Sequence, residues 1–154
     1  MNGKPQHATI TLERSYLAPL ERVFSEFADP VARAQWSAPT EDVLIYDEAD
    51  FRVGGKDVFH CGPKDHPKFR GETRYLFIAP NVYVVSSETI EMDGQCLAIS
   101  LTTLDFEPTE NGTNLKVTLQ IASFVGPGMI LGSESGYKCA LENLSQHLSN
   151  RLPS

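Results

Sequence analysis

Apolar and polar residues alternate through most of the chain between residues 42 and 122, and this pattern constrains the fold more than any other feature. Such alternation is typical of strands with one face buried and the other in water. We expect a first strand at residues 8–14. Further strands are predicted at 42–47, 53–61, 69–78, 82–92, 95–106 and 113–122. Asp93-Gly94 and Asn111-Gly112 favour type I′ hairpin turns, because these residue pairs accept positive φ angles. The pattern therefore predicts a long antiparallel meander.

Each strand of this meander is expected to have one apolar face. In the last strand the odd-numbered residues from Leu115 to Ile121 are all apolar, and their neighbours are polar. In the preceding strand we assign Leu97, Ile99 and Leu101 to the inner face. An apolar sheet face needs a covering layer. The C-terminal segment is the only long helix that the sequence predicts, so we expect it to lie on that face.

The C-terminal segment has the spacing of an amphipathic helix, since apolar residues from Tyr137 to Leu148 recur every three or four positions. Gly128, Gly132 and Gly136 recur every four residues on the same track, although a glycine inside a helix costs roughly 1 kcal/mol relative to alanine. Two interpretations stay open. Either one helix spans 128–150 and its small residues leave volume for a ligand, or the glycines form a loop and the helix starts at Ser133 or later.

Two short helices are predicted between the first strand and the meander. Residues 18–30 place Leu20, Val23, Phe24 and Phe27 on one helical stripe, and Pro30 ends or restarts the helix. Residues 31–36 follow as a second short helix. We therefore expect a single α+β domain over residues 1–154, in which a curved antiparallel sheet of about six or seven strands wraps around a long C-terminal helix.

Composition excludes several classes of function. Thirteen Lys and Arg residues against twenty Asp and Glu residues give a net charge of -7, which argues against a nucleic-acid binder. The cysteines are three in number and far apart, which predicts neither a disulfide framework nor a metal knuckle. The first residues contain no apolar stretch, and no run is long enough to span a membrane. A cytoplasmic, unprocessed protein is expected.

Several motifs narrow this order of elements to a family. They are Arg14-Ser15-Tyr16-Leu17-Ala18-Pro19-Leu20-Glu21-Arg22-Val23-Phe24, Phe27-Ala28-Asp29-Pro30, Trp36, Phe51-Arg52-Val53-Gly54-Gly55, Phe69-Arg70-Gly71 and Gly136-Tyr137. On these motifs taken together, the chain resembles the helix-grip fold of the START and birch-pollen-allergen-like (SRPBCC) superfamily. Within that superfamily it is similar to the branch named after the activator of heat-shock-protein-90 ATPase, over nearly its whole length.

The chain departs from that branch at two positions. Tyr137 stands where the branch usually has a tryptophan, and Ser37-Ala38-Pro39 follows Trp36 where a second tryptophan or glycine is usual. The resemblance therefore implies a pocket of altered shape, with a phenol hydroxyl in place of an indole.

The candidate chemical groups are few. His60, Cys61 and His66 lie close in sequence, but Pro63 and Pro67 bracket a loop that contains His66, and neighbouring strand residues point to opposite faces, so we expect no metal and no cofactor. None of the cysteines has the neighbours that stabilise a thiolate. Glu72, Arg74 and Glu88 lie in the central strands. We expect them to form an outward, solvated ladder, with an inward, functional position as the alternative.

The first functional hypothesis is a carrier or sensor for a small hydrophobic or amphipathic ligand such as a lipid, with a stress-related role as one option. The ligand would lie between the sheet and the C-terminal helix. An enzyme of the cyclase, hydrolase or isomerase type using the same cavity is less favoured, and a co-chaperone-like interaction module is the third option. We expect a monomer or a weak homodimer. The expected walls are Trp36, Phe59, Leu101, Met129, Tyr137 and Leu141, and the candidate polar contacts are His60, Arg74 and Glu88.

Overall fold

The computed structural model describes residues 4–38 and 41–150, in which seven strands and three helices follow one another. Pro39 and the first three residues, which the sequence analysis discusses, lie outside this range. The elements are β1 (Gln6–Tyr16), α1 (Leu20–Ala28), α2 (Pro30–Trp36), β2 (Asp42–Glu48), β3 (Lys56–Pro63), β4 (Phe69–Ala79), β5 (Tyr83–Met92), β6 (Gln95–Pro108), β7 (Thr113–Ser123) and α3 (Pro127–Asn150). The predicted order of elements is confirmed.

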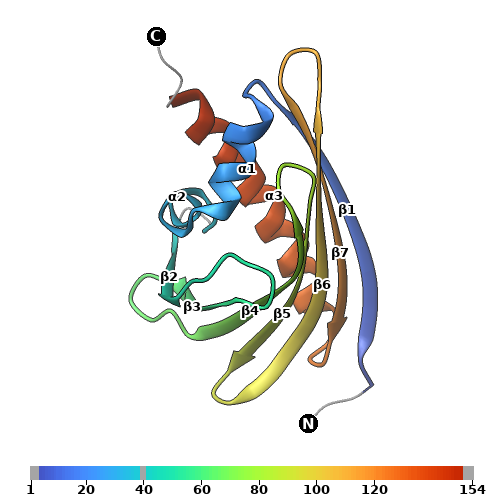
Figure 1. The fold of residues 1–154 in the computed structure, drawn as a ribbon. Helices are drawn as coiled ribbons and strands as arrows, with labels where there is room; N and C mark the ends of the chain where they lie inside the picture. Colours follow the sequence, from blue (N-terminus) through green and yellow to red (C-terminus); the bar gives the residue numbers. More distant parts are fainter. Residues whose placement is uncertain (1–3, 39–40, 151–154) are drawn as a thin grey trace.

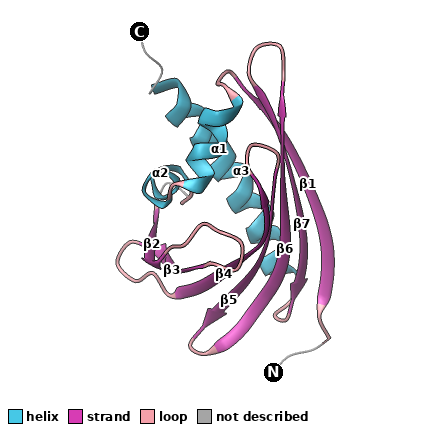
Figure 2. Ribbon diagram, viewed as in Figure 1, coloured by secondary structure: helices cyan, strands magenta, loops and turns pink. Residues whose placement is uncertain are grey.

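The strands form one antiparallel sheet in the order β1-β7-β6-β5-β4-β3-β2. The sheet curves, and α3 lies on its concave side, while α1 and α2 close the end where α3 terminates (Figure 1). The two layers are plain when the chain is coloured by secondary structure (Figure 2). None of the helices in the described part of the chain is long and apolar enough to cross a membrane.

The helix α3 begins at Pro127, so the glycines belong to it and the loop interpretation is wrong. Proline suits this first position because its missing N–H would have no partner inside the helix and its φ is already helical. Asp29 likewise starts α2, since its carboxylate accepts a hydrogen bond from the backbone N–H of Val31 at 2.9 Å and Pro30 follows it.

One of the two predicted hairpin turns is confirmed. Asp93 and Gly94 have φ angles of 53° and 80°, as a type I′ turn requires. Asn111 and Gly112 are not among the residues with positive φ, so this expectation is wrong. Gly112 is needed for a different reason, because a Cβ atom there would lie 2.0 Å from the carbonyl oxygen of Tyr16.

The core lies between α3 and the β1–β7 end of the sheet, and α3 packs against β1, β7 and α2. The odd-numbered residues from Leu115 to Ile121 are buried on the concave face, as predicted. The hydroxyl of Tyr16 donates to the carbonyl of Leu141 at 3.1 Å and joins the first strand to the last helix. The side-chain amide of Asn143 donates to the carbonyl of Trp36 at 3.2 Å and joins α3 to α2.

The predicted inner face of β6 is wrong at two of its three residues, since Leu97 is buried but Ile99 and Leu101 are not. Ile99 and Leu101 are 44% and 37% exposed on the convex face, whereas Ser100 and Thr102 are buried. Ser100 pairs with Ile121 and Thr102 with Leu119, and both of these partners face the helix. The even-numbered residues Leu104 and Phe106 are buried farther along the same strand, and they identify the true inner face.

Candidate functional site

A row of polar residues crosses the concave face of the sheet. Asp57 pairs with Thr73, Thr73 with Glu88, and Glu88 with Ser100, so the row runs from β3 to β6. The next row along the strands contains Tyr75, Ser86 and Thr102, which also pair directly. Residues directly opposite on antiparallel strands have their side chains in contact on the same face. The concave face is therefore polar along these two rows of β3–β6 and apolar at β7 and β1.

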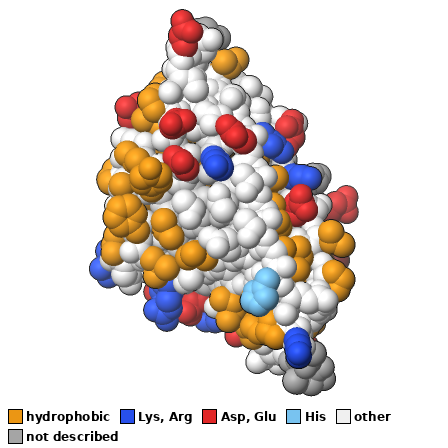
Figure 3. All heavy atoms as spheres, turned by 90° about the vertical axis from the view of Figure 1, so that its right-hand side faces the viewer, with side chains coloured by type: hydrophobic (Ala, Val, Ile, Leu, Met, Phe, Trp, Pro, Cys, Tyr) orange, Lys and Arg blue, Asp and Glu red, His pale blue; other side chains and the backbone are white. Residues whose placement is uncertain are grey.

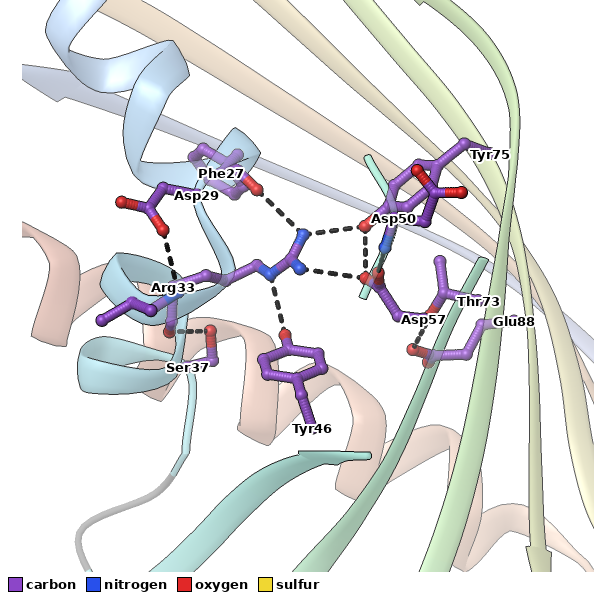
Figure 4. A network of polar contacts seen from close by, with 11 residues as sticks. Phe27, Asp29, Arg33, Ser37, Tyr46, Asp50, Asp57, Thr73, Tyr75 and Glu88 are labelled. Carbon is purple, nitrogen blue, oxygen red and sulfur yellow. Dashed lines mark hydrogen bonds and ion pairs between the residues drawn. The ribbon is translucent and has the colours of Figure 1, made fainter. Parts of the chain in front are cut away.

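One end of this row is occupied by an ion pair (Figure 4). The guanidinium of Arg33, from α2, contacts the carboxylate of Asp57 at 2.9 Å. Arg33 also donates to the hydroxyls of Tyr46 at 2.7 Å and Tyr75 at 2.8 Å, and to the carbonyl of Phe27 at 2.8 Å. Both charged side chains are nearly inaccessible to water. These contacts fix α2 against β2, β3 and β4.

The protonation states in this cluster follow from its contacts. Asp57 also accepts hydrogen bonds from the hydroxyl of Tyr75 and, at 3.1 Å, from the backbone N–H of Asp50. Burial opposes the charge of Arg33, but the neighbouring Tyr46, Tyr75 and Asp57 outweigh it, and the pKa of Arg33 is raised. Burial raises the pKa of Tyr46 to about 12, although Arg33 acts the other way. Arg33 is therefore a cation, its tyrosine partners are neutral, and its charge is balanced by the carboxylate of Asp57.

Glu88 is the other acid of the row, and unlike Asp57 it has no cationic partner among the described residues. Its Oε1 accepts a hydrogen bond from the hydroxyl of Thr73 at 3.2 Å, and its Oε2 has no hydrogen-bond donor among the described residues. No described Lys, Arg or His forms an ion pair with Glu88. Burial is the largest cause that raises its pKa; the bond from Thr73 lowers it, the charge of Asp57 raises it and that of Arg33 lowers it.

Glu88 is desolvated and yet only half-buried. A side chain has both properties when it faces the interior and borders a space that other side chains do not fill. A molecule the size of water reaches part of this carboxyl group. Glu88 therefore faces the interior without being sealed off from water.

Tyr137 approaches the same row from α3. Burial raises the pKa of its phenol, the charge of Glu88 raises it further, and hydrogen bonding with Thr102 lowers it. Tyr137 is half-buried and packs against the edge of the core. Its hydroxyl is therefore neutral and lies close enough to Glu88 and Thr102 for each to affect it.

The glycines of α3 leave space beside the helix. A Cβ atom added to Gly128, Gly132 or Gly136 would meet no atom of another element within 4 Å. Gly128 and Gly132 are exposed and Gly136 is half-buried, so the first two do not lie on the inward stripe as expected. Gly136 precedes Asn143 by two helical turns and shares its side of the helix. The side chain of Asn143 bonds to α2 there, whereas a Cβ atom at Gly136 would meet no atom of another element.

The structure brings together only some of the residues predicted for the site. Trp36, Phe59 and Leu141 are buried, and Met129 and Tyr137 are half-buried on α3. Trp36 packs edge-on against Phe27, with ring centroids 4.8 Å apart. Phe59 covers Gly71 on the concave face. Phe59 lies in the row of the sheet next to the polar row, whereas Trp36 and Leu141 belong to the hydrophobic core.

Three of the predicted residues lie elsewhere. Leu101 faces the convex side. His60 also lies on that side of β3, where its Nδ1 is 2.7 Å from the carboxylate of Asp47. Arg74 pairs with Glu72 at 2.9 Å in an exposed ladder, as predicted for both residues. Of the three charged strand residues considered together, only Glu88 points inward.

The sequence analysis missed Thr73, Ser86, Ser100 and Thr102. Two of them lie in β6, and the apolar pair Leu104 and Phe106 would have revealed their direction. Counting back by twos from Phe106 reaches Thr102 and Ser100 without interruption, because the structure has no register shift there.

Two surface hollows lie away from Asp57, Thr73 and Glu88 of the polar row. One, of about 600 Å³, is on the convex face, where its lining includes His7, Ser87 and Leu101. Figure 3 looks onto this side of the molecule, where exposed hydrophobic side chains gather beside uncharged polar ones. The other, of about 560 Å³, lies between α1 and α2. The convex hollow includes Ser100, at the β6 end of the polar row, but neither hollow includes Asp57, Thr73 or Glu88. The convex one is lined by no buried charge, so we favour the concave face as the site.

The described residues contain no group of three or more His, Cys, Asp or Glu side chains that would hold a metal ion. All three cysteines are free, and burial together with the charges of Glu88 and Asp42 raises the pKa of Cys61 to about 11. Its thiol is thus protonated at neutral pH. What the site offers is one partly accessible carboxyl group surrounded by hydroxyls, which can bind hydrogen-bond donors or exchange a proton.

A curved antiparallel sheet that holds a long C-terminal helix, with polar groups kept on the face that it covers, defines a helix-grip domain. A family model described as Activator of Hsp90 ATPase homolog 1-like protein matches residues 17–149, and the chain belongs to that family. This confirms the resemblance drawn from the sequence motifs.

Solved structures agree with this assignment. The Mll3558 protein of Rhizobium loti is 32% identical, with a TM-score of 0.84, and the match covers 94% of this chain and 99% of that one. An uncharacterised protein of Rhizobium leguminosarum is 27% identical, with a TM-score of 0.82 and coverage of 96% and 97%. The AHSA1 protein SPO3351 of Silicibacter pomeroyi shares the fold at 20% identity, with a TM-score of 0.79 and coverage of 94% and 100%. No curated protein matches the chain.

Proposed function

We propose that the chain binds a small amphipathic molecule between strands β3–β6 and the N-terminal half of α3. The observation that carries the proposal is the polar row beneath the helix. Polar groups on the inner face of a sheet are costly unless they are paired, and Oε2 of Glu88 in this row has no hydrogen-bond donor among the described residues. We place the ligand in the open space beside Gly136, because the next residue, Tyr137, approaches this row.

In this proposal the polar end of the ligand meets Glu88, Ser100 and the hydroxyl of Tyr137. The apolar end lies against Phe59 and Met129, whereas Leu141 and Trp36 belong to the core at the C-terminal half of α3 and lie outside this ligand site. Leu101, His60 and Arg74 take no part, because their side chains lie on the other face of the sheet.

The experiment is a titration with Nile red, a neutral apolar dye that becomes fluorescent when it leaves water. Gly136→Leu adds a side chain into the open space and is expected to weaken dye binding by about tenfold or more, which is about 1.4 kcal/mol. Ser135→Leu is the matched control, since it adds the same side chain to an exposed neighbouring position of α3. Thermal melts of both variants verify folding. If Gly136→Leu binds the dye as the unchanged protein does, the site is not beside Gly136.

A second candidate is an enzyme that uses the same site. A partly accessible carboxyl group with a raised pKa is suited to act as a general acid or base, and Glu88 has both properties. Native mass spectrometry of the protein purified from its own host distinguishes the two candidates. A carrier retains a ligand whose mass stays constant on incubation, whereas an enzyme converts it.

A further inference from the structure

We infer that the polar end of the ligand is a cationic amine and that the carboxylate of Glu88 recognises it. This inference rests on the proposed function and adds the chemical class of the ligand. It follows from the charges on the concave face, from the hydrogen bonds that Glu88 lacks, and from the hydroxyls around it.

On the concave face, one carboxyl group has no cationic partner of its own among the described residues. Arg33 is the cation whose charge acts on Glu88, and its guanidinium is already committed to Asp57, two tyrosine hydroxyls and the carbonyl of Phe27. The other titratable groups that share an electrostatic interaction with Glu88 are Tyr46 of β2, Asp57 and Cys61 of β3, and Tyr137 of α3. None of these is a cation, so no described group offers Glu88 a free positive charge, and a cationic ligand would supply one and favour the ionised form of the carboxyl group.

The hydrogen bonds of Glu88 also favour a cationic amine. Glu88 Oε1 is occupied by the hydroxyl of Thr73, and Oε2 lacks a donor. Ser100 faces Glu88 across the β5–β6 pair, and Tyr137 and Thr102 lie beside it. An ammonium group has three N–H donors in a tetrahedral arrangement. One donor fits Oε2, and the others fit hydroxyl oxygens, which accept as readily as they donate.

Other polar groups at the end of a ligand would make fewer favourable contacts with Glu88 and its neighbouring hydroxyls. A carboxylate would bring a second negative charge next to Glu88. An alcohol would supply one donor and no charge. A ketone would accept a hydrogen bond from the neutral form of Glu88 but would donate none to the hydroxyls of Ser100 and Thr102. An ammonium pairs with the ionised carboxyl group in surroundings that screen the pair poorly.

The test is displacement of Nile red by four compounds with matched alkyl chains: octylamine, octanol, methyl hexyl ketone and octanoate, at neutral pH. We expect octylamine to displace the dye at roughly tenfold lower concentration than octanol or the ketone, because a hydrogen bond to a charged group contributes about 1.5–3 kcal/mol. Octanoate is expected to be the weakest competitor.

Glu88→Gln keeps the shape of the side chain and removes its charge, so the preference for octylamine is expected to disappear while octanol binding stays the same. Glu72→Gln, on the convex face, is the matched control and is expected to keep the preference. The inference is overturned if the ketone or octanoate competes better than octylamine, or if the preference survives in Glu88→Gln. Either result leaves ligand binding itself intact. Equal dye binding by Gly136→Leu instead overturns the proposed function.

Discussion

Glu88 makes the stability of the fold depend on pH. Its pKa in the folded protein lies above the ordinary glutamate value of about 4.3, mainly because the side chain is buried. The folded state therefore holds this proton more tightly than the unfolded state does. The stability that the protonated group contributes is complete below the ordinary value and is lost as the pH rises through the raised one.

We therefore predict that Glu88→Gln stabilises the protein increasingly as the pH rises above about 4.3. The measurement is the free energy of unfolding in urea at a series of pH values, for Glu88→Gln and for the unchanged chain. Glu72→Gln serves as the control, since Glu72 lies in the solvated ladder on the other face. Parallel pH curves for Glu88→Gln and the unchanged chain would show that Glu88 titrates normally.

At the scale of secondary-structure elements, two half-buried or buried glycines should respond in opposite ways to the same substitution. Gly136→Ala is expected to stabilise the protein by about 1 kcal/mol, because the Cβ meets open space and alanine favours the helix. Gly71→Ala, in β4, is expected to destabilise it by about 1–3 kcal/mol, because the Cβ would lie 2.1–2.6 Å from ring atoms of Phe59.

Unfolding in urea measures both effects. The smaller side chain of Phe59→Leu should recover part of the loss caused by Gly71→Ala, which separates a steric cause from a change in strand propensity. Stabilisation by Gly71→Ala would mean that the Phe59 ring moves aside at no cost.

The elements could be predicted from the sequence because their signals are local. The alternation in β7 and the spacing in α3 identified both elements and their inner faces. In β6 the apolar residues change from odd positions, ending at Leu101, to even positions, starting at Leu104. The first half of the strand therefore suggested the wrong face, and the polar row was missed with it. Local alternation fails wherever a strand carries apolar residues on both faces.

The site could not be predicted in the same way, because it depends on residues that are distant in sequence. Arg33 of α2 reaches Asp57 of β3, and that pair leaves Glu88 of β5 as the unbalanced acid. Nothing in the residues around position 88 distinguishes it from Glu72 of the neighbouring strand. Only the pairing of β4 with β5 and the position of α2 assign different roles to the two glutamates.

At the scale of the whole molecule, an inner strand and an edge strand of the sheet differ in how far neighbouring elements bury them. β7 lies between β1 and β6 and has its inner face fully buried. β2 is an edge strand that pairs with β3 alone and has no fully buried residue. We predict that backbone amides of β7 exchange with deuterium most slowly and those of β2 much faster, as measured by mass spectrometry of the native protein. Equal protection of the two strands would contradict this difference.

The pairing of β1 with β7 also has a consequence for how the chain is made. All eleven residues of β1, from Gln6 to Tyr16, pair with residues from Thr113 to Ser123. The ribosome releases the first segment long before the second, so β1 has to wait without a partner while the whole meander emerges. Its exposed apolar face during that interval is a natural target for chaperones that hold nascent chains.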